Sequence, residues 1–132
     1  MDPALVAYDT APLDQVVCEG RYEVTRESIA RFRRLMGYGK ATSDVTPAPS
    51  SMGLIYGLRL GWEFGVFPPG AIRMGDDDRF GVGVRAGDVL LTRLRIVEKF
   101  ERKNRKFMRY EMTTLNQGDE LVCSVAFTAI VP

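Results

Sequence analysis

The sequence contains no histidine. Histidine-based acid–base catalysis and histidine metal ligation are therefore excluded for this chain acting alone. Cysteine is scarce too, and Cys18 and Cys123 lie far apart without a CxxC motif. A zinc site would need several carboxylate ligands, so we predict no metal and no cofactor. The two thiols are expected to be free and buried, and they indicate a reducing compartment, the cytoplasm.

An excess of charge of either sign is also absent. The chain carries 18 basic and 17 acidic residues, which argues against a nucleic-acid partner. No run of about 20 apolar residues is present, so we predict no membrane span. Residues 1–14 lack the basic and apolar regions of a signal peptide. With 132 residues, the chain is expected to form one domain, 1–132, with its own core.

Residues 49–64, PSSMGLIYGLRLGWEF, are predicted to form a buried helix. Gly53, Gly57 and Gly61 recur every four residues and therefore form one stripe along it. Each glycine costs a helix roughly 1 kcal/mol relative to alanine, so the stripe indicates close approach of another backbone. The other side chains are apolar nearly all round, which is typical of a helix wrapped by the rest of its protein.

The chain before this helix is predicted to contain one strand and one further helix. Residues 1–14 are expected to be an extended arm, and a short strand lies within residues 15–25. A helix begins near Thr25, whose hydroxyl is a capping group, and ends at Gly37.

The chain after the central helix changes to the alternating pattern of strands. Strands are expected in four segments, 80–85, 88–100, 107–115 and 121–131. The second of them places four residues on one face: Leu90, Thr92, Leu94 and Ile96. Residues 101–106 and 116–120 are predicted hairpin turns, with Gly118 supplying a positive φ in the second. Helices followed by hairpin-linked strands indicate an α+β fold, a sheet curled around the central helix.

The order of these segments resembles that of a known family. The matching pieces are residues 24–37, 47–58, 80–90 and 115–131, and the best single motif is VRAGD at residues 84–88. They are similar to MaoC-like hotdog proteins, the (R)-specific enoyl-CoA hydratases and β-hydroxyacyl-ACP dehydratases, and above all to the FAS1-type N-terminal dehydratase half. The resemblance implies an antiparallel sheet wrapped around a helix, a dimer, and an acyl-thioester tunnel along its interface. It also implies a catalytic Asp and His (D-x4-H) after the first helix.

The sequence departs from that pattern at the catalytic pair. Asp44 lies in the matching loop, but Pro49 occupies the position five residues on. The family pairs catalytic hotdogs with hotdogs that have lost the Asp–His pair and shape the acyl tunnel for their partner. The resemblance therefore implies a non-catalytic subunit beside a second hotdog subunit.

Several residues are candidates for the site. Asp44 is either a residual catalytic group or a loop residue that bonds locally. The segment Ser50, Ser51, Met52 and Gly53 either offers backbone N–H groups to a thioester carbonyl or, through Ser50 or Ser51, only caps the helix.

Three charged features have alternative interpretations. Glu63 is either the base of a hotdog thioesterase or the partner of Arg59 in an i,i+4 ion pair, which we prefer. Residues 76–78, three aspartates, are expected to form a solvated loop rather than a metal site, because adjacent side chains diverge. Asp88 is expected to be structural. The basic residues of the first hairpin either meet CoA phosphates or an acidic carrier, or are merely solvated: Arg102, Lys103, Arg105 and Lys106.

Three functions follow from these alternatives. The first is a non-catalytic subunit of a heteromeric hydratase or dehydratase acting on an acyl-CoA or acyl-ACP. The second is a histidine-free thioesterase that uses Asp44 or Glu63. The third is a homodimer that binds acyl-CoA without turnover. Fatty, steroid and polyketide acyl groups are all compatible with the sequence.

Overall fold

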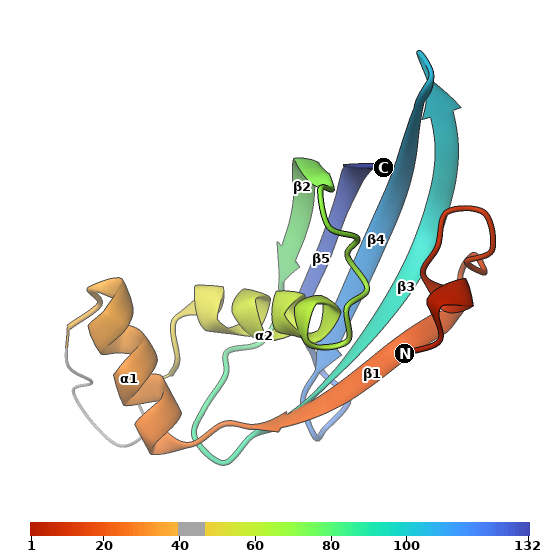
Figure 1. Cartoon of the computed structure of the whole chain (residues 1–132). Coiled ribbons are helices and arrows are strands. Elements are labelled where there is room, and N and C mark those ends of the chain that lie inside the picture. Colours follow the sequence, from red (N-terminus) through yellow and green to blue (C-terminus); the bar gives the residue numbers. More distant parts are fainter. Residues whose placement is uncertain (40–46) are drawn as a thin grey trace.

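A computed structural model describes residues 1–39 and 47–132 and shows a curved antiparallel sheet with a helix on its concave side (Figure 1). The two helices are α1 (Arg26–Met36) and α2 (Ser50–Glu63). The strands are β1 (Val16–Glu23), β2 (Ile72–Phe80), β3 (Val89–Arg102), β4 (Arg105–Leu115) and β5 (Leu121–Val131). Their order across the sheet is β1-β3-β4-β5-β2, and all pairings are antiparallel. The predicted α+β layout is confirmed.

The glycines of α2 allow it to lie close to the sheet. A Cβ placed on Gly53 would approach Val122 of β5 to 3.0 Å, and one on Gly57 would lie 3.5 Å from the Thr114 hydroxyl of β4. Both glycines thus face the sheet, but the atoms nearest to them belong to side chains, and only the contact at Gly53 is tighter than an ordinary van der Waals contact. The predicted close approach of another backbone is therefore wrong for these two glycines. Gly61 has a different neighbour, because a Cβ there would collide with the ring of Phe67 in the following loop.

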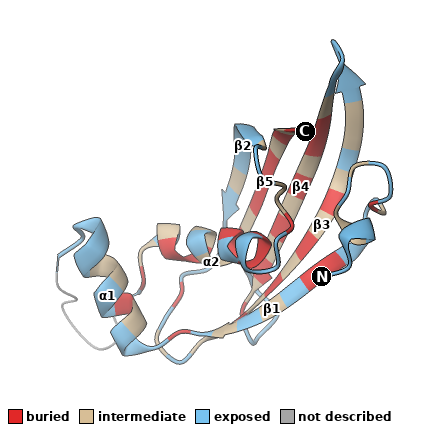
Figure 2. Cartoon of the chain, viewed as in Figure 1, coloured by how far each residue is buried: buried red, intermediate tan, exposed pale blue. Residues whose placement is uncertain are grey.

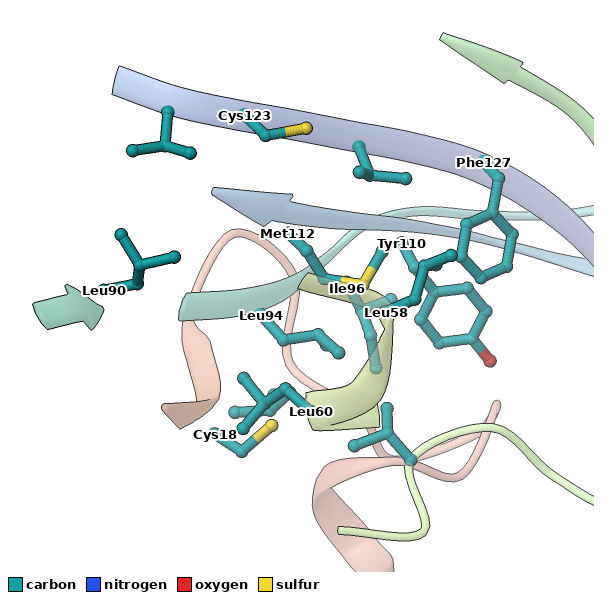
Figure 3. Close-up of a cluster of buried hydrophobic side chains, with 14 of the residues drawn as sticks. Cys18, Leu58, Leu60, Leu90, Leu94, Ile96, Tyr110, Met112, Cys123 and Phe127 are labelled. Carbon is teal, nitrogen blue, oxygen red and sulfur yellow. The ribbon is translucent and has the colours of Figure 1, made fainter. Parts of the chain in front are cut away.

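The core lies between α2 and the concave face of the sheet. The predicted face of β3 is confirmed, since Leu90, Leu94 and Ile96 are fully buried. Met112 and Tyr110 of β4 stand beside them and contact α2 from the neighbouring strand (Figure 3). Both cysteines are free and buried, as predicted, and burial raises the pKa of each thiol to about 11.

One buried polar pair crosses this core. The hydroxyls of Thr92 and Thr114 lie 2.7 Å apart, and both residues are almost completely buried. We expect Thr92→Val to lower the free energy of unfolding by about 1–3 kcal/mol, because it leaves the Thr114 hydroxyl buried without this partner. The double variant Thr92→Val/Thr114→Val should lose less than the sum of the two single variants. Urea unfolding of all four proteins measures this coupling, and strictly additive losses would contradict it.

The predicted boundaries of α1 are confirmed by its caps. The Thr25 hydroxyl accepts a bond from the Ser28 N–H, and the Ser28 hydroxyl accepts one from the Thr25 N–H. Gly37 ends the helix with a φ of 76°, a left-handed conformation that suits glycine.

The first strand after α2 was predicted in the wrong place. Residues 81–85 lie outside the strands, and the strand is Ile72–Phe80, which includes the three aspartates expected in a loop. The reason is that β2 is an edge strand, nearly all of it exposed (Figure 2). Without a buried face it has no apolar alternation to recognise.

Two smaller predictions were also wrong. The N-terminal segment is not an extended arm, because Pro3–Leu5 form a short 3₁₀-helix and Ala11 is buried. In the turn after β4 the residue with positive φ is Asp119, at 58°, rather than Gly118. The Asn116 carboxamide oxygen accepts bonds from the backbone N–H groups of residues 118 and 120, which fixes this turn.

The predicted hairpin between β3 and β4 is confirmed and is tight. Its two turn residues, Lys103 and Asn104, have φ values of 52° and 61°, as in the turns that suit twisted hairpins. Among residues 1–39 and 47–132, no helix is long and apolar enough to cross a membrane.

Candidate functional site

The predicted thioester-binding segment forms the first turn of α2. Residues 50–53 lie in the helix, and the N-cap is Pro49. The prediction that Ser50 or Ser51 caps the helix is wrong, since no side chain bonds at the cap. The Ser51 hydroxyl instead lies 3.1 Å from that of Tyr38. The Met52 N–H already donates to the Pro49 carbonyl at 2.9 Å. The donors that this turn still offers at the positive end of the helix dipole are therefore the N–H groups of Ser50 and Ser51.

A small hollow adjoins this turn. Its volume is about 40 Å³, and its walls come from the approach to α2, from residues 80–84 and from β5. Ser50 and Ala48 line one side, and Gly83 and Val122 line the other. A space of this size accepts one water molecule or one carbonyl oxygen. The other candidate from this region, Asp44, lies outside the described residues.

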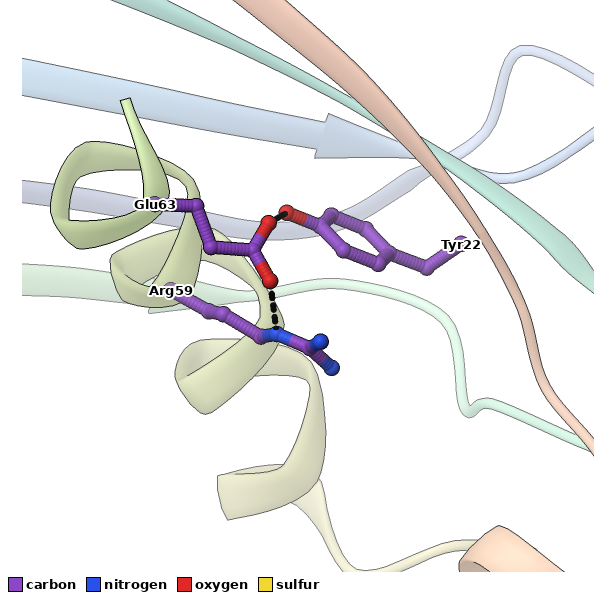
Figure 4. A network of polar contacts seen from close by, with 3 residues as sticks. All are labelled: Tyr22, Arg59 and Glu63. Carbon is purple, nitrogen blue, oxygen red and sulfur yellow. Dashed lines mark hydrogen bonds and ion pairs between the residues drawn. The ribbon is translucent and has the colours of Figure 1, made fainter.

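Glu63 lies at the opposite end of α2 and belongs to a three-residue network (Figure 4). Its Oε1 accepts a bond from Arg59 Nε at 2.5 Å, and its Oε2 accepts one from the Tyr22 hydroxyl at 2.9 Å. The predicted ion pair is confirmed. The Tyr22 hydrogen bond, together with Arg59, lowers the pKa of the Glu63 carboxyl. A carboxylate held in its charged form by two donors is a weak base, so a catalytic role for Glu63 stays a prediction that this geometry does not favour.

The basic hairpin tip is far from both ends of α2. Arg102, Lys103 and Arg105 stand where the β3–β4 hairpin projects beyond the other strands (Figure 1). Lys106 Nζ lies 3.8 Å from a carboxylate oxygen of Asp9, an exposed and therefore weak ion pair. The structure does not bring these cations to the turn at residues 50–53, and their role in substrate binding stays a prediction.

Asp88 has the structural role that was expected of it. One carboxylate oxygen accepts a bond from the Arg85 backbone N–H at 2.9 Å, and the other accepts one from the Gln117 carboxamide at 3.0 Å. Gly87 between them has a φ of 94° and donates its N–H to the Val24 carbonyl. The VRAGD motif thus ties the start of β3 to the end of β1 and to the β4–β5 turn. In the described part of the chain, no three Cys, Asp or Glu side chains cluster as metal ligands would.

Comparison with known proteins places the chain by its structure. No family model matches the sequence, and no curated protein matches it either. Solved structures do match. The MaoC-like dehydratase from Rhodospirillum rubrum has a TM-score of 0.72 at 19% identity, over 89% of this chain and 92% of that one. The chain has the hotdog fold.

Two further structures extend this result. The (R)-hydratase PhaJ1 from Pseudomonas aeruginosa matches with a TM-score of 0.70 and 18% identity, over 96% of this chain and 86% of that one. The HadBC (3R-hydroxyacyl-ACP dehydratase) complex from Mycobacterium tuberculosis matches with a TM-score of 0.68 and 21% identity, over 85% of this chain and 90% of that one. The predicted hotdog fold is therefore confirmed, with α2 as its central helix.

The hotdog contains a pocket that the sequence did not predict. It has a volume of about 160 Å³ and lies between α2, the loop after it, and the concave face of β4 and β5. Its walls are mostly aromatic or apolar: Leu58, Trp62, Phe67, Ala71, Tyr110, Phe127 and Ala129, with Arg73 at the β2 edge. These residues come from five separate segments, so no local spacing connects them. The one available signal was Trp62, the single tryptophan of the chain.

Proposed function

We propose that the chain is a cytoplasmic, non-catalytic subunit of a heteromeric (R)-specific 2-enoyl-thioester hydratase or 3-hydroxyacyl dehydratase. Its substrate would be an acyl-CoA or an acyl-ACP. The observation that carries the proposal is a hotdog fold, similar to that of a MaoC-like dehydratase and an (R)-hydratase, in a chain without any histidine. A second hotdog subunit would supply the Asp–His pair.

The chemistry of hydration shows which steps this chain could assist and which step a second subunit would have to supply. Hydration joins the oxygen of water to C3 of the enoyl group and a proton to C2, and negative charge develops on the thioester oxygen in between. A general base must take a proton from water, and this chain has no histidine for that step. The N-terminal turn of α2 can stabilise the thioester oxygen, because its N–H groups and dipole favour negative charge. The 40 Å³ hollow beside Ser50 would admit that oxygen.

The outer edge of β2 supports a partner that is a different chain. This edge is not paired within the sheet of described residues, and it exposes Ile72, Met74 and Phe80. An open edge strand is a ready template for another strand. Its middle carries three aspartates, of which Asp76 is paired with Arg73, so two copies joined here in a central register would bring four carboxylates that have no ion pair within the described residues into one seam. Like charges across a strand pair are destabilising, so the edge suits a basic partner better than its own copy.

Asp78 on β2 adds to this argument. Its Oδ1 is buried and has no hydrogen-bond partner among the described residues. Desolvation, and then the neighbouring Asp76, raise the pKa of this carboxyl. Because this oxygen is closed to solvent within the chain, a cationic side chain of the partner would approach the part of Asp78 that stays accessible, and its charge would lower the pKa of the carboxyl again. The likeness to the HadBC complex is in keeping with such an assembly.

The test is an activity measurement with crotonyl-CoA. The chain purified alone should give no hydration, and the chain co-expressed with a hotdog subunit that carries D-x4-H should give hydration that depends on that histidine. Hydration by the chain alone would disprove the proposal. Release of free CoA by the chain alone, abolished in Glu63→Gln, would support the thioesterase instead. Saturable acyl-CoA binding by a homodimer, without turnover in either preparation, would support the binding module.

A further inference from the structure

The aromatic pocket has walls suited to a ring. The ring of Phe67 stands edge-on to Tyr110 at 5.0 Å between centroids, with an interplanar angle of 85°. It also lies 5.3 Å from Phe127 and 6.0 Å from Trp62, again in edge-to-face arrangements. Aromatic rings prefer such offset and perpendicular contacts at these distances. A further ring in this space would find both faces and edges already in place.

The volume of the pocket also suits a single six-membered ring. Its volume of about 160 Å³ is close to the roughly 150 Å³ of an apolar protein cavity that binds benzene. Ala71 and Ala129, two short side chains, leave this space open on the sides of the loop and of β5. Trp62 stands at the rim with 62% of its surface exposed, so the pocket opens beside the C-terminal end of α2.

Two polar groups limit what can occupy the pocket. Tyr110 is fully buried, and its hydroxyl donates a bond to the sulfur of Met108 at 3.5 Å, a weak acceptor. Figure 3 shows this hydroxyl pointing away from the aliphatic side chains of Leu94 and Met112. At the edge, Arg73 stacks over Phe127 at 4.6 Å and is paired with the carboxylate of Asp76, so its charge is compensated. The interior is thus apolar and aromatic, with one hydroxyl able to bond to a guest.

We propose that this pocket binds the ring-bearing end of the substrate's acyl group, a flat six-membered ring in preference to a straight alkyl chain of equal carbon number. The inference rests on the proposed function for the identity of the guest as an acyl group. The preference itself depends only on the walls of the pocket, so it can be measured without turnover.

Trp62 reports directly on the pocket, because it lines the rim and is the single tryptophan. The full chain is titrated with three neutral alcohols of equal carbon number: benzyl alcohol, cyclohexylmethanol and 1-heptanol. We expect benzyl alcohol to shift the Trp62 fluorescence to shorter wavelength with a Kd on the order of 1 mM. It should bind about 2- to 10-fold more tightly than 1-heptanol, although 1-heptanol is the more hydrophobic of the two. Tightest binding of 1-heptanol, or no binding of benzyl alcohol, would overturn the proposal.

Variants locate the binding. Ala71→Leu fills the pocket from its rim and Ala129→Leu fills it from β5, and each should weaken benzyl alcohol binding at least about 10-fold. Ala71 is only half-buried, so its variant tests the pocket even where Ala129→Leu is unstable. Ile55→Ala, in the separate groove between α1 and α2, should bind as the wild type does. Undiminished binding in Ala71→Leu would place the alcohol elsewhere.

The co-expressed complex separates this inference from the proposed function. It should hydrate a phenyl-terminated 2-enoyl-CoA with a lower KM than a straight-chain 2-enoyl-CoA of equal carbon number, and Ala71→Leu should remove the difference. Ring binding without any hydration would overturn the proposed function and leave the pocket standing. Hydration with equal KM values and no alcohol binding would overturn the pocket alone.

Discussion

Replacing Asp77 and Asp78 with lysine should weaken capture of the proposed partner at least about 100-fold, because like charges facing one another in an interface cost several kcal/mol. Both residues lie in the middle of β2, at the free edge of the sheet. The reversal would turn an acidic seam into a basic one opposite a basic partner strand. Co-purification from a co-expressing strain, followed by titration of the separated subunits, measures the loss.

The control variant also reverses two negative charges, but at positions away from β2. Glu27 on α1 and Glu98 on β3 are exposed and lie away from β2, so Glu27→Lys/Glu98→Lys should keep wild-type affinity. The effect of the β2 variant should shrink at high salt, since exposed charges are screened. Mixing the β2 variant with the wild type should also produce mixed dimers, because the two edges then carry opposite charge. Unchanged partner affinity in a folded β2 variant would show that the partner docks on another surface.

The fold was predictable where the structure of a segment depends on residues close to it in the sequence. The buried face of β3 follows from period-two alternation, and the ends of α1 follow from Thr25 and Gly37, whose roles are local. The stripe of glycines in α2 indicated the face that packs against other parts of the chain, because glycine destabilises a helix interior relative to alanine. These signals lie within a few residues of sequence, where single-sequence patterns are informative.

The edge strand and the aromatic pocket were not predictable for the same physical reason. β2 buries little within its own chain, so its sequence reflects an exposed edge and carries no core pattern. The pocket is closed by the loop that follows α2, where Phe67 packs on Gly61 and reaches Tyr110 and Phe127. Neither the loop conformation nor the contact between distant segments leaves a trace in local spacing. For the site, the sequence predicted the ion pair of Glu63, while the Tyr22 hydrogen bond from β1 required the fold.

Substitutions at Gly57 should change the sign of their effect with side-chain size. An alanine Cβ would meet Thr114, Met112 and Val125 at 3.5–3.9 Å, which are ordinary contacts. Gly57→Ala should therefore raise the free energy of unfolding by up to about 1 kcal/mol through helix propensity. Gly57→Leu should lower it by about 3 kcal/mol, because the longer side chain would be forced into the packed surface of β4 and β5.

Gly61→Ala provides the matched comparison for this prediction, one helical turn further on. The same change there should be destabilising, because its Cβ would collide with the ring of Phe67. Urea unfolding of the three variants measures all the differences on one scale. Equal stability of Gly57→Leu and the wild type would mean that the sheet does not approach α2 at this turn. Opposite signs at Gly57 and Gly61, if observed, would show that the loop that closes the aromatic pocket requires glycine at position 61, whereas the sheet leaves room for a methyl group at position 57.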